Sequence, residues 1–304
     1  MKSISILGVY VADLAFFADE IPIIGETIIG KEYFIGPGGK GSNQAVAAAK
    51  AGAKTFFVSK IGDDQFGSMA KKIYDEAGVD YSKVIISKEH ATGAAGILVN
   101  KKGQNTINVV TGAGGALTNG DIDNALSTIT TSSVFLTNLE VPKEVVFHAL
   151  EIAKSNNVPT ILNPAPASAI NADIFPLIDY FTPNEAEASF YVNHKVENED
   201  DAKKASQQLL QLGIKNVIIT LGDKGAYFAN NEESFHINAM NLKEKVVDTT
   251  GAGDAFNAGF AVALTEEKKI KDSITFANVT AGLSTMKIGT AKSMPLRYEI
   301  DNLL

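Results

Sequence analysis

The feature that most restricts the fold is a regular alternation of strand-like and helix-like segments in the second half of the chain. Short apolar runs, typical of buried strands, occur at Val134–Asn138, Pro159–Asn163, Tyr180–Pro183 and Val217–Leu221. Between them lie helix-like stretches at Lys143–Asn156 and Asp200–Leu212. Strands alternating with helices of this length indicate βαβ units and a mostly parallel sheet, so we expect an α/β fold.

Both ends of the chain follow a compatible pattern. Strand-like runs are predicted at Ser3–Tyr10 and Lys54–Ile61. Helices are predicted at Gly41–Gly52, Phe66–Ala77, Gly251–Thr265 and Ile270–Lys287. No internal repeat and no Pro/Ser-rich linker divides the sequence, which favours one continuous domain.

Two segments do not fit this alternation. Leu14–Ile35 is interrupted by Pro22 and two glycines, and we expect several short strands there. Gly93–Val110 contains two β-prone runs on either side of Asn100–Gly103, a turn-type cluster that predicts a hairpin. Both segments can form one small sheet outside the main one.

Composition and charge exclude several classes of protein. The chain of 304 residues has no cysteine, which excludes disulfides, thiolate zinc sites and cysteine nucleophiles and indicates a cytoplasmic protein. With 27 Lys and Arg against 35 Asp and Glu, its net charge of −8 argues against a nucleic-acid partner. No apolar run approaches the ~20 residues that span a bilayer, so no membrane partner is expected. Asp13 comes too early for a secretory signal peptide.

A first glycine-rich cluster, Gly36–Asn43 (GPGGKGSN), comes just before an alanine-rich predicted helix. Glycines allow unusual backbone angles, and amides at a helix N-terminus attract anions. Lys40 adds a cation, and Asn43 adds a group that both donates and accepts hydrogen bonds. Gly41 follows Lys40, so the P-loop pattern does not apply. The alternative is a structural turn capped by Ser42.

A second cluster, Asp248–Phe256 (DTTGAGDAF), opens another predicted helix. Gly251, Ala252 and Gly253 place backbone amides at the helix N-terminus, where they can form an anion hole. Asp254 follows in the first helical turn, and a carboxylate beside an anion site makes sense as a base for an attacking hydroxyl. The alternative is that Asp254 only complements the helix dipole.

Together the two clusters resemble the two signatures of the ribokinase (PfkB-type) family of carbohydrate kinases. Further segments that resemble the family are Asn163–Pro166, Asn184–Glu187, Thr220–Gly225 and Lys287–Pro295. The resemblance covers the whole chain and implies a Rossmann-like three-layer α/β/α sandwich with a small β-sheet lid. It implies a single kinase domain over residues 1–304, with lid segments at roughly 13–35 and 93–110.

The resemblance implies an ATP-dependent kinase that phosphorylates the C5 hydroxyl of D-ribose to give ribose 5-phosphate. It also implies Mg²⁺ as cofactor and K⁺ as an activating cation. Alternatives are a related kinase acting on another sugar or a nucleoside, and a non-catalytic sensor built on the same fold. A sensor has no use for a base at the position of Asp254. Apolar lid residues suggest a homodimer formed through the lid: Ile28, Ile29, Ile97 and Val99.

Individual roles follow from the same resemblance. Asp254 resembles the catalytic base, with the amides of Gly251, Ala252 and Gly253 as the anion hole. Residues resembling the sugar-binding set are Asp13, Gly39, Lys40, Gly41, Asn43 and Glu140. Residues resembling the nucleotide-binding set are Asn184, Thr220, Gly222, Asp223, Gly225, Gly253 and Asn278, with Glu187 acting indirectly on Mg²⁺. Residues resembling the loops that bind the monovalent cation, partly through backbone carbonyls, are Asp248, Thr250, Ser284, Lys287, Gly289 and Ser293.

The chain departs from the family pattern at one substrate-binding position. Members of the family that act on ribose usually have an asparagine two residues before the aspartate, where this chain has Val11 before Asp13. Pro37 also stands where another glycine is common. Phosphoryl transfer is unaffected by either change, but an isopropyl group cannot hydrogen-bond a sugar hydroxyl.

Overall fold

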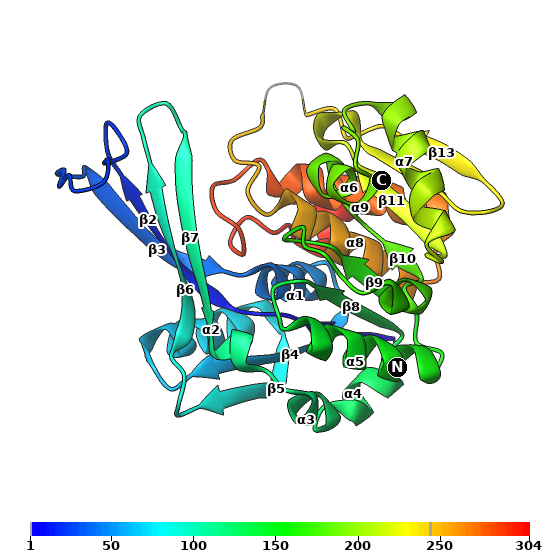
Figure 1. The fold of residues 1–304 in the computed structure, drawn as a ribbon, viewed down its shortest axis with the longest axis horizontal. Coiled ribbons are helices and arrows are strands. Elements are labelled where there is room, and N and C mark those ends of the chain that lie inside the picture. The colour runs from blue at the N-terminus through cyan, green and yellow to red at the C-terminus, as the bar shows by residue number, and fades with distance from the viewer. Residues whose placement is uncertain (1, 243–244) are drawn as a thin grey trace.

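The computed structural model describes residues 2–242 and 245–304. Its main sheet has nine strands in the order β13-β12-β11-β10-β9-β8-β1-β4-β5 (Figure 1). In this order, all neighbouring strands between β11 and β5 pair in parallel. β12 and β13 extend the β11 edge of the sheet as antiparallel strands. The bounds are β1 (Ser3–Leu7), β4 (Lys54–Gly62), β5 (Asp80–Ser87), β8 (Val134–Asn138), β9 (Thr160–Asn163), β10 (Tyr180–Phe181), β11 (Asn216–Thr220), β12 (Ala226–Ala229) and β13 (Ser234–Ile237).

Helices cover both faces of this sheet. The α-helices are α1 (Lys40–Lys50), α2 (Gln65–Ala77), α3 (Asn119–Asp123), α4 (Leu126–Thr131), α5 (Lys143–Ser155), α6 (Glu185–Val192), α7 (Glu199–Gln211), α8 (Ala252–Thr265), α9 (Ile270–Ser284) and α10 (Arg297–Asp301). Short 3₁₀ helices occupy η1 (Ala113–Ala116), η2 (Ala172–Leu177) and η3 (Gly222–Lys224). None of the helices in the described part of the chain is long and apolar enough to cross a membrane.

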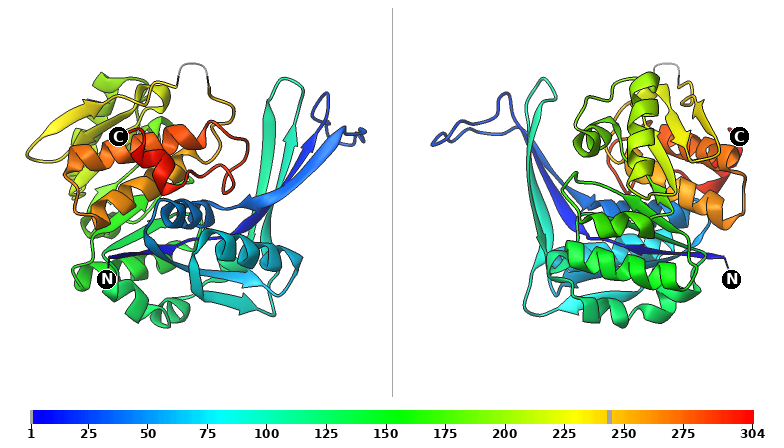
Figure 2. Two further views of the ribbon diagram at one scale, coloured as in Figure 1. Left: turned by 180° about the vertical axis from the view of Figure 1, so that it is seen from behind. Right: turned by 45° about the vertical axis from the view of Figure 1, so that its right-hand side comes forward.

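Two separate hydrophobic clusters show that the sheet is the middle of three layers. Along β11, Ile218 belongs to the cluster that includes residues of α1, α2, α8 and α9, whereas Val217 and Ile219 belong to the other cluster, which includes residues of α5 and α7. This alternation follows from the period-two pattern of a strand that is buried on both sides. The expected α/β/α sandwich is therefore confirmed, and Figure 2 shows the helices on each side.

A second sheet of four strands, called the lid sheet below, projects from the side of the main one (Figure 2). Its order is β3-β2-β6-β7, formed by β2 (Val11–Phe17), β3 (Glu32–Gly38), β6 (Thr92–Val99) and β7 (Asn105–Gly112). The hairpin predicted around Asn100–Gly103 is confirmed. The prediction of several short strands within Leu14–Ile35 is right about strands and wrong about their number: the segment contributes only to β2 and β3, which pair along their whole length, and residues 18–31 contain no strand.

Candidate active site

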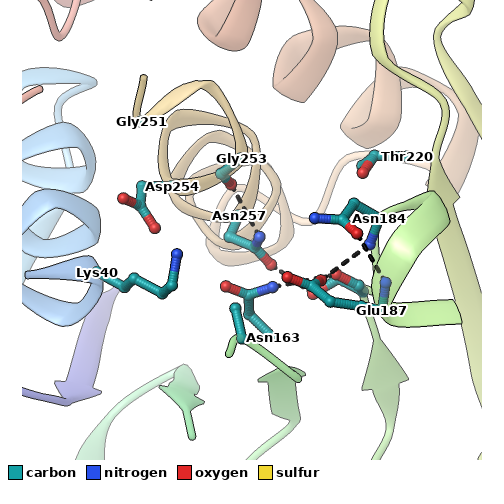
Figure 3. A pocket seen from close by; sticks show the side chains of 11 residues that line it. Lys40, Asn163, Asn184, Glu187, Thr220, Gly251, Gly253, Asp254 and Asn257 are labelled. Carbon is teal, nitrogen blue, oxygen red and sulfur yellow. Dashed lines mark hydrogen bonds between the residues drawn. The ribbon is translucent and has the colours of Figure 1, made fainter. Parts of the chain in front are cut away.

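A polar cleft of about 150 Å³ lies where the N-termini of α1 and α8 meet the ends of β9, β10 and β11 (Figure 3). Parallel α/β sheets bind ligands at the carboxyl ends of their strands, and this cleft has that position. The residues lining it are Lys40, Asn163, Ala165, Thr182, Asn184, Glu187, Thr220, Gly251, Gly253, Asp254 and Asn257. Of the twenty-four positions singled out from the sequence, seven therefore line one cavity: Lys40, Asn184, Glu187, Thr220, Gly251, Gly253 and Asp254.

Asp254 lies in the first turn of α8 and is buried, with 6% of its surface exposed. Its Oδ2 accepts a hydrogen bond from Asn43 Nδ2 at 2.9 Å, and its Oδ1 accepts one from Gln44 Nε2 at 3.2 Å. Burial raises the pKa of Asp254, while the charge of Lys40 and these hydrogen bonds oppose the rise. Figure 3 shows the Lys40 ammonium directed at this carboxylate, whose charge raises the pKa of Lys40.

The glycines of the first cluster let α1 begin against the end of β1. A Cβ at Gly41 would lie 2.6 Å from the Cα of Gly8, and one at Gly39 would lie 2.6 Å from the carbonyl oxygen of Val9. Gly39 also has a φ of 87°, which disfavours any residue with a side chain. The close approach explains how Lys40 and Asn43 reach a carboxylate on α8. Gly39 and Gly41 thus shape the loop through their backbone.

The second cluster forms the turn before α8. Gly251 adopts a left-handed conformation with φ 79°, and no atom lies within 4 Å of a Cβ built at Gly253. Both residues line the cleft, so their backbone is free to face an anion. The amide of Ala252 was expected in the anion hole, but its N–H instead donates to the Thr249 carbonyl at 3.2 Å inside the turn.

Two further side-chain acceptors, Asp13 and Asn43, lie near the first glycine cluster. The Asp13 carboxylate lies against Gly38, where an added Cβ would be 2.4 Å from it. Burial, with the charge of Asp254 as a second cause, raises the pKa of Asp13 to about 6. Oδ1 of Asn43 is buried and accepts no hydrogen bond from the described residues. A buried acceptor without a partner is costly, so Oδ1 of Asn43 is suited to accept a hydrogen bond from a ligand hydroxyl.

Glu140 follows β8 and fixes the loop before α1. Its Oε2 accepts a hydrogen bond from the backbone N–H of Lys40 at 2.8 Å. Burial raises the pKa of Glu140 to about 7, against the opposing effect of Lys40. Part of its capacity as an acceptor is therefore used to hold the protein loop.

The opposite end of the cleft is built on α6. Asn184 caps this helix and forms a reciprocal capping box with Glu187. Glu187 is buried, and burial raises its pKa. Thr220 at the end of β11 pairs with Asn184 in an isolated parallel bridge, which places both beside Glu187.

The remaining nucleotide-side positions lie beyond the cleft lining. Gly222, Asp223 and Gly225 form the turn between β11 and β12, and Gly222 and Gly225 have φ of 57° and 105°. Asn278 on α9 does not line the cleft, because its Nδ2 donates to the Asn238 carbonyl at 3.1 Å. Asn278 therefore ties α9 to the segment after β13 in this structure.

The two predicted cation loops do meet. Asp248 accepts hydrogen bonds from the N–H groups of Thr250 and Gly289, both at 2.9 Å. The hydroxyls of Ser284 and Ser293 donate within their own turns, and Lys287 pairs with Glu299 at 3.1 Å. Any contribution of these last three residues to a cation site would come from their backbone carbonyls.

Sequence reasoning missed four polar residues of the site: Gln44, Asn163, Thr182 and Asn257. Gln44 Nε2 lies 3.2 Å from both Asn163 Oδ1 and Asp254 Oδ1, and Thr182 donates to Asn257. The available signals were the position of Gln44 next to Asn43 and that of Asn163 in the family-like segment Asn163–Pro166. Val11 is 3% exposed and packs beside Gly93, outside the cleft lining.

Comparison with known proteins gives a consistent result. Residues 1–297 match the pfkB family carbohydrate kinases. The chain is 38% identical to a ribokinase of Haemophilus influenzae over 98% of this chain and 97% of the relative, and 33% identical to a deoxyribokinase of Salmonella typhi over 96% and 95%. It superposes on the structure of Arabidopsis thaliana ribokinase complexed with ribose and ATP, with a TM-score of 0.95, 31% identity and coverage of 100% and 99%.

Proposed function

Because this chain belongs to the pfkB family of carbohydrate kinases, we propose that it transfers the γ-phosphoryl group of ATP to the C5 hydroxyl of D-ribose. The O5–P bond forms, the bond between phosphorus and the β–γ bridging oxygen breaks, and ADP and ribose 5-phosphate leave. The similarity to ribokinases along nearly the whole chain supports this reaction, as does the likeness to a ribokinase complexed with ribose and ATP.

The buried carboxylate of Asp254 beside the amides of Gly251 and Gly253 carries this proposal. Its Oδ atoms accept the proton of the sugar hydroxyl, while the two glycine amides face the phosphoryl oxygens. Lys40 favours the ionised form of Asp254, since its charge opposes the rise in pKa caused by burial. Asp13 and Asn43 accept hydrogen bonds from the other sugar hydroxyls and orient the ring.

The cleft fits Mg²⁺ at its nucleotide end. Oxygen donors, which Mg²⁺ prefers, are supplied there by Glu187, Asn163 and Asn257. No cluster of three or more His, Cys, Asp or Glu side chains that could hold a metal occurs in residues 2–242 and 245–304. We infer from the family resemblance that Glu187 would hold the ion indirectly, and bound Mg²⁺ would neutralise phosphate charge. Asn184 keeps Glu187 in place through the capping box.

The loops at Asp248 and Gly289 fit a monovalent cation. Carboxylate and carbonyl oxygens form the donor set, and the hydrogen bonds of Asp248 hold the two loops together. Thr250 directly precedes Gly251, so K⁺ bound there would stabilise the anion hole without touching the sugar. Among the proposed cation ligands, Asp248 supplies the negative charge.

A specific observation favours a second candidate substrate, a sugar that lacks one hydroxyl. Val11 and Asp13 alternate with Ala12 along β2 and so lie on the same face of the strand. Val11 offers carbon where a hydroxyl would need a partner, and a deoxyribokinase is among the relatives. 2-Deoxyribose is therefore the alternative acceptor.

A lid-to-lid homodimer is part of the proposal, although only some of the expected residues support it. Ile97 is partly buried against the core, whereas Ile29 is 92% exposed. The lid sheet also exposes Phe16, Tyr33, Phe34, Ile35, Ile107, Val109 and Val110. Many large apolar side chains exposed on one small sheet support an interaction surface there. We take the lid as part of a single domain spanning residues 1–304 and place the protein in the cytoplasm.

The test is ADP release from Mg·ATP with ribose, 2-deoxyribose, fructose and nucleosides as acceptors. We expect ribose to give the largest kcat/KM. A larger value for a nucleoside would contradict the proposal, and binding of sugar without ADP release would favour the non-catalytic sensor.

A further inference from the structure

Thr290 contacts both halves of the active site. Its hydroxyl donates a hydrogen bond to the carbonyl of Pro37 at 2.9 Å, across 253 positions of sequence. Its methyl group lies beside Gly251, where an added Cβ would be 3.3 Å from Thr290 Cγ2. Pro37 belongs to the lid strand β3 and Gly251 to the turn before α8. One buried side chain therefore links the sugar side to the phosphate side.

Pro37 is connected directly to the groups that face the sugar. The Asp13 carboxylate rests on Gly38, the next residue, with no room for a Cβ between them. The chain then passes through Gly39 to Lys40, whose N–H is held by Glu140. A displacement of the Pro37 carbonyl therefore shifts the backbone that supports Asp13 and Lys40.

The loop that carries Thr290 is itself held in place. Asp248 accepts a hydrogen bond from the N–H of Gly289 at 2.9 Å. Lys50, at the end of α1, donates to the carbonyl of Ala291 at 3.1 Å, and Ser293 donates to the carbonyl of Thr290 at 2.7 Å. Thr290 is thus fixed on both sides, as an anchor must be.

We propose that Thr290 is a positioning residue that holds the sugar-binding loop at the correct distance from the anion hole. Its hydroxyl acts on sugar binding through Pro37, and its methyl group acts on phosphoryl transfer through Gly251. Thr290 does not line the cleft, so it acts through these neighbours. The inference rests on the proposed function, because it assigns sugar to one side of the cleft and phosphate to the other.

Two variants separate the two contacts. Thr290→Val keeps the shape but removes the hydroxyl, so we expect the KM and the calorimetric Kd for ribose to rise about 5-fold or more. The kcat and the KM for ATP should change less than about 2-fold, since the methyl contact with Gly251 remains. Thr290→Ser keeps the hydroxyl and loses the methyl, so the ribose KM should return to the wild-type value while kcat falls.

Thr275→Val is the matched control. Thr275 is an exposed residue on α9 whose hydroxyl donates to the Lys271 carbonyl at 2.9 Å, so the same kind of bond is lost away from the site. We expect it to leave both constants at wild-type values.

An unchanged ribose KM and Kd in Thr290→Val would overturn the inference. A uniform rise in the KM of both substrates with a lowered melting temperature would also overturn it, because that pattern indicates general destabilisation. Failure of the proposed function looks different: the wild-type protein would then release no ADP with any sugar. The Kd for ribose in Thr290→Val would still decide the positioning role.

Discussion

Nδ2 of Asn43 lies 2.9 Å from Oδ2 of Asp254, although the two residues are 211 positions apart. This hydrogen bond joins the first turns of α1 and α8 and leaves the Oδ1 of Asn43 buried without a partner among the described residues. One side chain thus holds the proposed base with its amide group and offers its oxygen to a sugar hydroxyl.

We expect Asp254→Asn to lower kcat by at least ~10²-fold, the lower range for a positioned general base. The amide has nearly the same shape, so the fold and the Kd for ATP should remain close to wild type. Steady-state kinetics and calorimetric titration with ATP check these expectations. Turnover near the wild-type rate would remove Asp254 from the role of base.

Gln44→Leu should move the acidic limb of the pH profile of kcat to higher pH. Gln44 donates one of the two side-chain hydrogen bonds that lower the pKa of Asp254, so its loss raises that pKa further. Gln207→Leu, an exposed change on α7, serves as the control. If kcat falls by the same factor at every pH and the profile does not move along the pH axis, the substitution has no effect on the pKa of Asp254.

The sequence predicted the parts of this site that depend on local backbone chemistry. The glycine clusters located the starts of α1 and α8, because glycine is required where Gly41 meets Gly8 and where Gly251 turns. Gln44 was missed because its partners, Asn163 and Asp254, come together only through the fold.

The missed elements have a similar explanation. β5 (Asp80–Ser87) is an edge strand that is only partly buried, and its apolar run is limited to the three residues Val84, Ile85 and Ile86. β12 is four residues long and follows a tight turn, which leaves little pattern to detect. α6 has almost no amphipathic pattern, and its one local signal was the capping box of Asn184 and Glu187.

Asp13→Asn should stabilise the protein while weakening sugar binding. The folded pKa of Asp13 is about 6, above its ordinary value of 3.8, so the folded state holds the proton more tightly. Its contribution to stability is present at acid pH and is lost as the pH rises from about 4 through about 6. At pH 7.5 the substitution should therefore raise the free energy of unfolding by about 2–3 kcal/mol.

Urea denaturation at pH 7.5 measures this gain, with Asp63→Asn, an exposed change before α2, as the control. The ribose KM should rise in Asp13→Asn, since an amide replaces the carboxylate that accepts sugar hydroxyls. An unfolding free energy that falls in this variant would show that ionised Asp13 has a stabilising partner.

Activity should be higher with K⁺ than with Na⁺ at equal ionic strength. The physical reason is that the Asp248 and Gly289 loops supply oxygen donors next to the turn that forms the anion hole. Asp248→Asn should remove most of this dependence while leaving the ribose KM close to wild type. Equal activity in potassium, sodium and Tris buffers would contradict a cation site here.

Val11→Asn tests which sugar the pocket fits. A sugar hydroxyl buried against the Val11 isopropyl group lacks a partner, which costs roughly 1–3 kcal/mol, or about 5- to 150-fold in affinity. A bridging water can recover part of this cost. If ribose is the substrate, an asparagine at this position restores the hydrogen bond, and we expect the KM for ribose to fall about 5-fold.

The same substitution should act oppositely on a sugar without that hydroxyl, because the amide would then face carbon. We therefore expect kcat/KM for 2-deoxyribose to fall in Val11→Asn while that for ribose rises. Val109→Asn, at an exposed position of the same lid sheet, controls for adding an amide to the lid. A residue that contacts the sugar must change the ratio of kcat/KM for ribose to that for 2-deoxyribose when its polarity changes. If this ratio stays constant in both variants, Val11 packs only against Gly93 and carries no specificity.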